Sequence, residues 1–137
     1  MRSTVIVLLG LLALAGAVPV SAHHAFTAEF DANSPVTLKG EVVKVEWTNP
    51  HAWLHINVKG PDGKVVEWAI EQGSPNTLIR RGFAKNTIQP GTIVTVEGYR
   101  SKNGSAIAAG RRVTLPDGRA FVAGSDDKGP GTGEKEY

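Results

Sequence analysis

The chain of 137 residues contains no cysteine, so disulfides, thiolate metal sites and cysteine nucleophiles are excluded. It also lacks a large surplus of either charge, because 15 Lys and Arg stand against 13 Asp and Glu. A formal net charge of +2 is too small for the basic face that neutralises phosphates, and no nucleic-acid partner is expected. A glycine-rich phosphate loop and a serine with an adjacent base are likewise missing. These absences favour a binding protein and leave any enzymatic activity unassigned.

Long apolar runs are also missing, except for one near the beginning of the chain. Arg2 precedes the uncharged apolar residues 5–18, and small residues follow up to Ala22. This order predicts a signal peptide over residues 1–22, with cleavage after Ala22 or, alternatively, after Ala17. The run is shorter than the roughly 20 residues that a bilayer span needs. We therefore expect a periplasmic or secreted protein without stable membrane insertion after cleavage.

The remaining residues are enough for one domain. Cleavage after Ala22 would leave 115 residues. We divide them into an N-terminal arm over 23–35, a β domain over 36–123 and a tail over 124–137. The tail is rich in Gly and charged residues and has almost nothing that could pack, which is typical of disorder.

Apolar residues alternate with polar ones through most of the β domain, and this period of two predicts strands. The expected strands are 36–47, 53–59, 65–71, 92–100 and 107–115. Ser74 and Pro75 form a good helix start, and Gly82 can end that helix. The order β-β-β-α-β-β predicts a five-stranded OB-like barrel. A small antiparallel β-sandwich is the alternative.

Two features of the strands can be predicted in more detail. The apolar positions of the first strand change from even numbers, ending at Val42, to odd numbers, beginning at Val43, which requires a bulge or bend. Gly40 is the expected position of that bend. In the following hairpin, pairing Lys59 with Val65 sets every inward residue opposite another inward residue. The same register places His55 outward, diagonally between the carboxylates of Glu67 and Glu71.

The four histidines suggest a metal site. Cleavage after Ala22 would give a chain that begins with His23, whose free amine and imidazole are ligands for copper. The candidate metal ligands are His23, His24, His51 and His55. Acidic residues that could orient an imidazole are Glu29, Asp31 and Glu71. The expected ligand is copper or another divalent metal. Alternatively, the histidines are solvated residues that bind local backbone or carboxylates.

Tryptophans on both sides of one loop suggest a second kind of site. Trp47 ends the first expected strand and Trp53 begins the second, so both flank the loop that holds Asn49 and His51. Exposed aromatic side chains at the rim of a barrel can stack on a small ligand or on another exported protein. The candidate ligand-binding residues are Trp47, Asn49, Trp53 and Glu71. Alternatively, the two tryptophans close the end of the barrel.

Several short motifs resemble those of a family of small exported bacterial proteins of uncharacterised function. They are His-His-Ala-Phe at 23–26, Glu-Phe-Asp at 29–31, Trp-Thr-Asn-Pro-His-Ala at 47–52, Glu-Gln-Gly-Ser-Pro-Asn at 71–76 and Arg-Arg-Gly at 80–82. The resemblance extends from about His23 to Gly124 and implies a single exported domain. It brings no catalytic residue with it.

Overall fold

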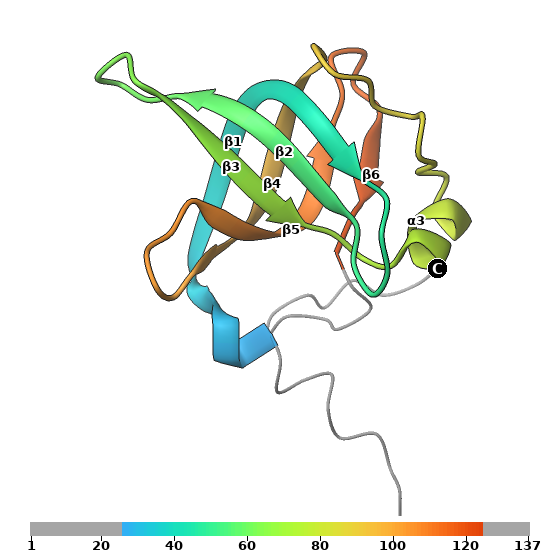
Figure 1. The fold of residues 1–137 in the computed structure, drawn as a ribbon, viewed down its shortest axis with the longest axis horizontal. Coiled ribbons are helices and arrows are strands. Elements are labelled where there is room, and N and C mark those ends of the chain that lie inside the picture. Colours follow the sequence, from blue (N-terminus) through green and yellow to red (C-terminus); the bar gives the residue numbers. More distant parts are fainter. Residues whose placement is uncertain (1–25, 125–137) are drawn as a thin grey trace, which may run out of the picture.

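The computed structural model of this chain describes residues 26–124 (Figure 1). The predicted signal peptide, His23, His24 and the residues from 125 onward lie outside the described residues. A helical turn over 26–29 leads into the first strand. The further elements are β1 (Phe30–Glu46), β2 (Trp53–Lys59), β3 (Val65–Glu71), α3 (Pro75–Arg80), β4 (Ile93–Ser101), β5 (Ile107–Thr114) and β6 (Ala120–Val122). Within residues 26–124, no helix is long and apolar enough to cross a membrane.

All six strands belong to one sheet in the order β3-β2-β1-β4-β5-β6. A further parallel pairing joins β3 to β5 through Ala69–Glu71 and Ile107–Ala109. This pairing closes β1, β2, β3, β5 and β4 into a ring, which Figure 1 shows from one side. The predicted order of three strands, a helix and two strands is therefore confirmed. The short strand β6 pairs with β5 outside the ring, in addition to the five strands of the predicted barrel.

The predicted change of face in β1 occurs, but not at Gly40. The pairing of β1 with β2 shifts between Val42 and Lys44, so Val43 is the bulged residue. Val43 faces solvent, whereas Val45 packs against the core. Gly40 instead lies in the middle of the sheet, where an added Cβ would be 2.4 Å from the carbonyl oxygen of Asn57. A glycine stands there because the neighbouring backbone leaves no room for a side chain.

The predicted register of the β2–β3 hairpin is confirmed. Lys59 pairs with Val65 at the turn, Ile56 pairs with Trp68, and Trp53 pairs with Glu71 at the far end. Leu54, Ile56 and Ile70 are fully buried inside the ring. The opposite face of the hairpin carries the polar residues, and it is this face that holds the candidate site.

One end of the ring is closed by α3 and the segment that follows it. The side chain of Ser74 accepts a hydrogen bond from the backbone N–H of Thr77 and so caps α3 as predicted. Leu78 is fully buried in the core. The ring of Phe83 lies 6.1 Å from that of Trp47 and 5.3 Å from that of Phe121, measured between centroids.

Candidate functional site

His51 and Glu71 form an ion pair between the β1–β2 loop and the end of β3. The hydroxyl of Thr48 donates to the carbonyl oxygen of His51 at 3.0 Å, within a loop that contains a cis peptide bond before Pro50. Two backbone hydrogen bonds tie this loop to the segment directly after β3: the N–H of Ala52 donates to the carbonyl of Gly73, and that of Gln72 donates to the carbonyl of Ala52. These bonds fix the loop so that the imidazole reaches the carboxylate.

Glu29 lies on the helical turn that precedes β1 and acts on Glu71 through its charge. The turn is attached to the β4–β5 connection, because the N–H of Lys102 donates to the carbonyl of Glu29 at 2.9 Å. The ammonium of Lys102 also donates to the carbonyl of Thr27. On the other side, the ring of Phe26 packs edge-on against that of Tyr99, with 5.8 Å between centroids. Glu29 is thereby held within electrostatic range of Glu71.

The electrostatics of Glu71 reflect its burial among these groups. Its side chain is only 15% exposed. Burial raises the pKa of Glu71 above its ordinary value of 4.5, the charge of His51 opposes this, and the charge of Glu29 raises the pKa further. We call Glu29, His51 and Glu71 the acid–histidine cluster. Its two carboxylates repel each other through their charges.

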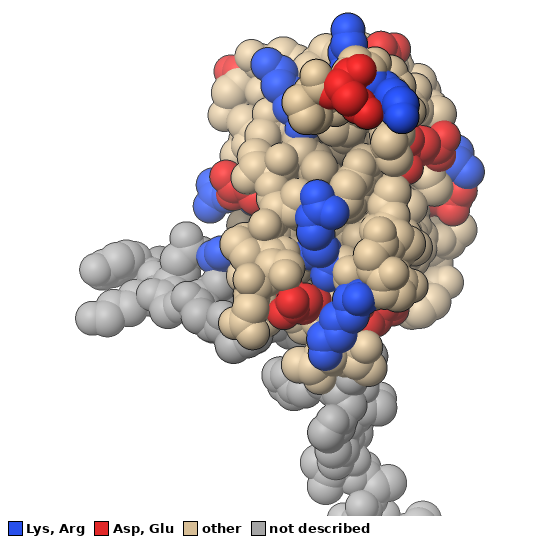
Figure 2. Space-filling view, turned by 90° about the vertical axis from the view of Figure 1, so that its left-hand side faces the viewer, with Lys and Arg blue, Asp and Glu red and all other residues tan. Residues whose placement is uncertain are grey.

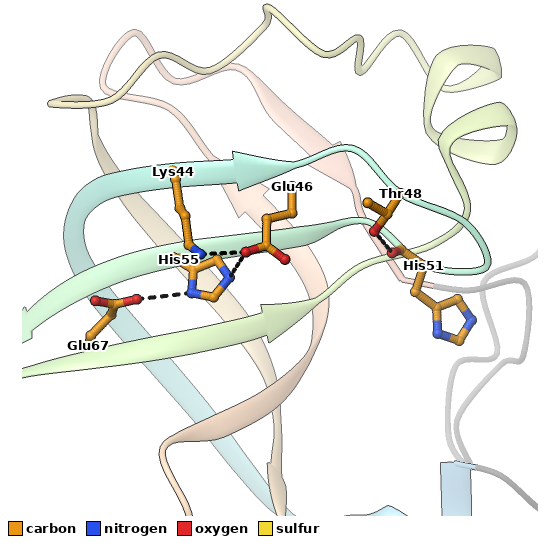
Figure 3. Close-up of polar contacts among 6 residues, drawn as sticks. All are labelled: Lys44, Glu46, Thr48, His51, His55 and Glu67. Atoms are coloured by element: carbon orange, nitrogen blue, oxygen red, sulfur yellow. Dashed lines mark hydrogen bonds and ion pairs between the residues drawn. The ribbon is translucent and has the colours of Figure 1, made fainter.

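His55 lies in a separate polar group on the outer face (Figure 3). Its Nδ1 is 3.0 Å from Oε1 of Glu67 on β3, and its Nε2 is 3.4 Å from Oε1 of Glu46 on β1. Glu46 also forms an ion pair with Lys44. The imidazole therefore lies between two carboxylates as expected, but the second one is Glu46, because Glu71 is paired with His51.

The sequence did not identify Glu46 and Lys44 as partners of His55. Both precede the loop on β1, and their alignment with β2 depends on the bulge at Val43. With that bulge, Lys44 pairs directly with His55. The apolar pattern of β1 indicated a change of face but did not give the position of the bulge. If the bulge had been placed at Val43, the pairing of Lys44 with His55 would have followed, and with it the position of Glu46.

The predicted metal ligands are not brought together within the described part of the chain. His51 and His55 point in different directions and contact different carboxylates (Figure 3). No group of three or more His, Cys, Asp or Glu side chains in residues 26–124 is arranged to hold a metal ion. Asp31 was expected to orient an imidazole. Its carboxylate instead accepts hydrogen bonds from the N–H of Asn33 and the hydroxyl of Ser34. His23 and His24 precede the described residues.

The candidate ligand-binding residues around the loop differ in how deeply they are buried. Trp47 is partly buried and packs against the core beside Phe83. Trp53 is half-buried on the outer face, where it pairs with Glu71 in the ladder. Asn49 is exposed in the loop. Of the two tryptophans, Trp53 is therefore the one that lies beside the acid–histidine cluster.

Charges of both signs are mixed on the surface. Figure 2 shows Lys and Arg interspersed with Asp and Glu on the face that it draws. One arginine also covers an aromatic ring: the guanidinium carbon of Arg100 lies 5.0 Å from the ring centroid of Trp68, a cation–π contact.

Comparison with known proteins places the chain in a family. A family model described as "Family of unknown function (DUF6152)" matches residues 11–110. The chain belongs to the DUF6152 family. This confirms the resemblance to an uncharacterised family, and the matched range includes Glu29, His51, His55 and Glu71. None of the curated proteins and none of the solved structures matches the chain.

Proposed function

We propose that this protein is exported and binds Cu(II), or a similar divalent metal, on the outer face of an OB-like barrel. The order of the ring, with a parallel β3–β5 pairing and α3 between β3 and β4, supports the OB-like assignment. Proteins of that fold bind ligands on the face of strands 2 and 3 and in the loops between strands 1 and 2 and between strands 4 and 5. Export is supported by the charged start, apolar run and small residues of the predicted signal peptide.

The observation that carries the proposal is the acid–histidine cluster on this face. His51 comes from the β1–β2 loop, Glu71 from β3, and Glu29 from the turn attached to the β4–β5 connection. The His51–Glu71 pair thus lies where the fold ordinarily holds a ligand, and Glu29 acts on Glu71 through its charge. A divalent cation would offset the repulsion between Glu29 and Glu71 and could bind the imidazole.

The N-terminal arm can supply the remaining ligands. His23 precedes Glu29 by six residues, and six residues span at most roughly 20 Å when fully extended. After cleavage at Ala22, the amine and imidazole of His23 would therefore reach the cluster if the arm folds back. An amine with two imidazoles is a nitrogen-rich set of the kind that favours Cu(II) among divalent metals. His55 is left out of this set because both of its ring nitrogens face carboxylates.

The test is a Cu(II) titration of the mature protein in the presence of a competing chelator. The protein is first secreted from a bacterial host, and its intact mass should correspond to a chain that starts at His23. His51→Gln, and separately one residue added ahead of His23, should each weaken Cu(II) binding at least about tenfold. His55→Gln is the matched control and should bind like the wild type. A chain that starts at Val18, or affinity unchanged by both alterations, would contradict the proposal.

A second candidate function is the capture of a small organic ligand or another exported protein around Trp53. It is favoured by the half-exposed position of that side chain beside Glu71, whereas Trp47 packs against Phe83 and the core. This alternative predicts that Trp53→Ala folds normally and loses a partner that the wild type retains, with no change in Cu(II) affinity.

A further inference from the structure

The small net charge of the chain hides an uneven distribution of charge along it. Residues 26–71 contain 4 Lys and Arg against 7 Asp and Glu, which gives a formal charge of −3. Residues 72–124 contain 8 Lys and Arg against 2 Asp and Glu, which gives a formal charge of +6. The second half of the described chain is therefore strongly basic.

Six of these basic residues come from two segments that contact each other. Residues 75–90 carry three basic residues and no acid, and residues 111–124 carry three more and one acid. The six are Arg80, Arg81, Lys85, Arg111, Arg112 and Arg119. Nη1 of Arg81 donates to the carbonyl oxygen of Gly124 at 2.6 Å, which joins the two segments. We call these two segments the basic side.

The basic side lies away from the face that carries mixed charges. In Figure 1, α3 and β6 are on the right, whereas the β2–β3 turn is at the upper left. Figure 2 draws the left-hand side of that view, where both signs are interspersed. The surplus of positive charge is thus confined to one part of the surface.

A bulge in β5 makes two successive arginines of the basic side accessible. Arg112 pairs with Glu97 of β4, and Gly110 pairs with the residue that directly follows Glu97. Arg111 is therefore an extra residue in β5. The residues before and after the two arginines are buried, whereas Arg111 is exposed and Arg112 is half-buried. In a regular strand one of two successive side chains would point into the core, so the bulge is what keeps both outside.

Three of the six cations have no acidic partner among residues 26–124. Arg112 lies 3.8 Å from a carboxylate of β4, and Arg119 pairs with the carboxylate two residues before it. Arg80, Lys85 and Arg111 are exposed and form no ion pair within that range. Their charges are available to an anionic partner, and arginine in particular binds phosphate through two parallel hydrogen bonds.

Two large apolar side chains are exposed among these cations. Ile79 on α3 is 54% exposed and Val122 on β6 is 48% exposed. Ile79 directly precedes Arg80, and Val122 pairs with Arg112 in the ladder. The carbonyl oxygen of Val122 also accepts a hydrogen bond from Arg81. Apolar side chains flanked by cations are typical of surfaces that adsorb to membranes, where the cations approach lipid phosphates and the apolar groups enter the boundary of the acyl chains.

We propose that the basic side binds the surface of membranes that contain anionic lipids. Charge complementarity favours an anionic partner, and the exposed Ile79 and Val122 favour a lipid surface over a nucleic acid or an acidic protein. The predicted export would place the protein beside such surfaces. This inference is independent of the proposed metal binding.

The experiment measures cosedimentation of the secreted protein with lipid vesicles, in the presence of a chelator that removes divalent metals. Vesicles with about 30% phosphatidylglycerol should bind the wild type at least about tenfold more tightly than vesicles of phosphatidylcholine alone. The difference should shrink as the salt concentration rises. Equal binding to both kinds of vesicle, or binding to neither, would overturn the proposal.

Charge substitutions locate the contact. One basic residue near an anionic membrane strengthens binding roughly fivefold, so Arg80→Glu combined with Arg111→Glu should weaken it at least about tenfold. Arg80→Gln combined with Arg111→Gln, which only removes the charges, should lose less. Lys39→Glu combined with Lys59→Glu is the matched control, because both side chains are exposed on β1 and β2 and the net charge changes equally. An equal loss in this control would show that net charge alone governs binding and would overturn the assignment to the basic side.

A last variant separates a lipid surface from other polyanions. Ile79→Ser should weaken binding to the anionic vesicles about fivefold and leave binding to heparin, a soluble polyanion, unchanged. Circular dichroism should show that each variant is folded. If Ile79→Ser binds the vesicles as tightly as the wild type, or if heparin binding falls in parallel, the basic side recognises anions without a lipid contact and the proposal is wrong.

Discussion

Nδ1 of His55 lies 3.0 Å from Oε1 of Glu67, across the ladder between β2 and β3. The other nitrogen of the ring faces Glu46 on β1, so a single imidazole links three neighbouring strands. The side chain of His55 is 15% exposed, whereas Glu46 and Glu67 are 41% and 51% exposed. Such half-solvated contacts stabilise a fold only modestly.

Replacing His55 should therefore cost a small, measurable amount of stability. We expect His55→Ala to lower the free energy of unfolding by about 1 kcal/mol, because two contacts with carboxylates are lost and Glu46 and Glu67 are left without the ring between them. Urea denaturation at neutral pH measures this. Lys64→Ala, at a side chain that is 83% exposed, is the control and should change stability little. An equal effect of the two substitutions would show that the imidazole makes no structural contribution.

The hairpin could be predicted from the sequence because its register depends on neighbouring residues alone. A tight turn at 60–64 and alternating apolar residues on both sides leave one pairing that sets every inward residue opposite another, although Val66, near the turn, is exposed. The bulge at Val43 could not be placed in this way. β1 pairs with β2 and with β4 at once, so the position of the bulge depends on strands that lie far away in the sequence.

The candidate site was predictable as a set of residue types but not as a set of contacts. His51 and Glu71 were both singled out, yet nothing in their spacing indicated that they form a pair. The pair depends on the conformation of the 47–52 loop, which is fixed by Thr48 and by backbone bonds to the end of β3. Loops of this kind follow no period, and their contacts are set by tertiary structure.

Gly40 should tolerate no side chain. The Cβ of Gly40→Ala would meet the carbonyl oxygen of Asn57 at 2.4 Å and its carbonyl carbon at 2.9 Å, and neither atom can move without opening the β1–β2 ladder. We expect a loss of about 3 kcal/mol or more in the free energy of unfolding. Gly104→Ala is the matched comparison, since its φ of +78° disfavours alanine while no atom lies within 4 Å of the new Cβ. That variant should lose only about 1 kcal/mol, and a similar loss in both would contradict the steric argument.

The two tryptophans beside the loop should respond differently to truncation. Trp47→Ala removes a ring that packs on Phe83 and the core, and we expect a loss of about 2–3 kcal/mol. Trp53→Ala removes a half-buried ring from the outer face and should cost about 1 kcal/mol or less. Thermal unfolding followed by far-ultraviolet circular dichroism compares both with the wild type. If Trp53→Ala unfolds the protein, that side chain is structural and the second candidate function loses its support.

Asp31 should contribute stability that disappears in acid. The backbone N–H of Asn33 and the hydroxyl of Ser34 lower the pKa of Asp31 below its ordinary value of 3.8. Because the folded pKa is the lower one, the stabilisation is fully present above the unfolded pKa and is lost as the pH falls through the folded value. Asp31→Asn should therefore be less stable than the wild type at neutral pH, and the difference should shrink in acid. Urea unfolding between about pH 6 and pH 2 measures this, and a difference that does not change with pH would contradict it.

Gln72 is 2% exposed, and neither its amide nitrogen nor its amide oxygen has a hydrogen-bond partner among the described residues. A buried amide without partners lowers the free energy of unfolding by about 1–3 kcal/mol. Gln72→Met keeps the length of the side chain and removes the polar atoms. This variant should therefore raise the free energy of unfolding by about 1 kcal/mol. Thr77→Val is the matched control, because Thr77 is also buried but its hydroxyl accepts hydrogen bonds from Ser74 and Arg80. This control should lose stability, since it leaves the hydroxyl of Ser74 without its acceptor. A loss in Gln72→Met as well would mean that the amide is paired in solution, most simply with a buried water inside the ring.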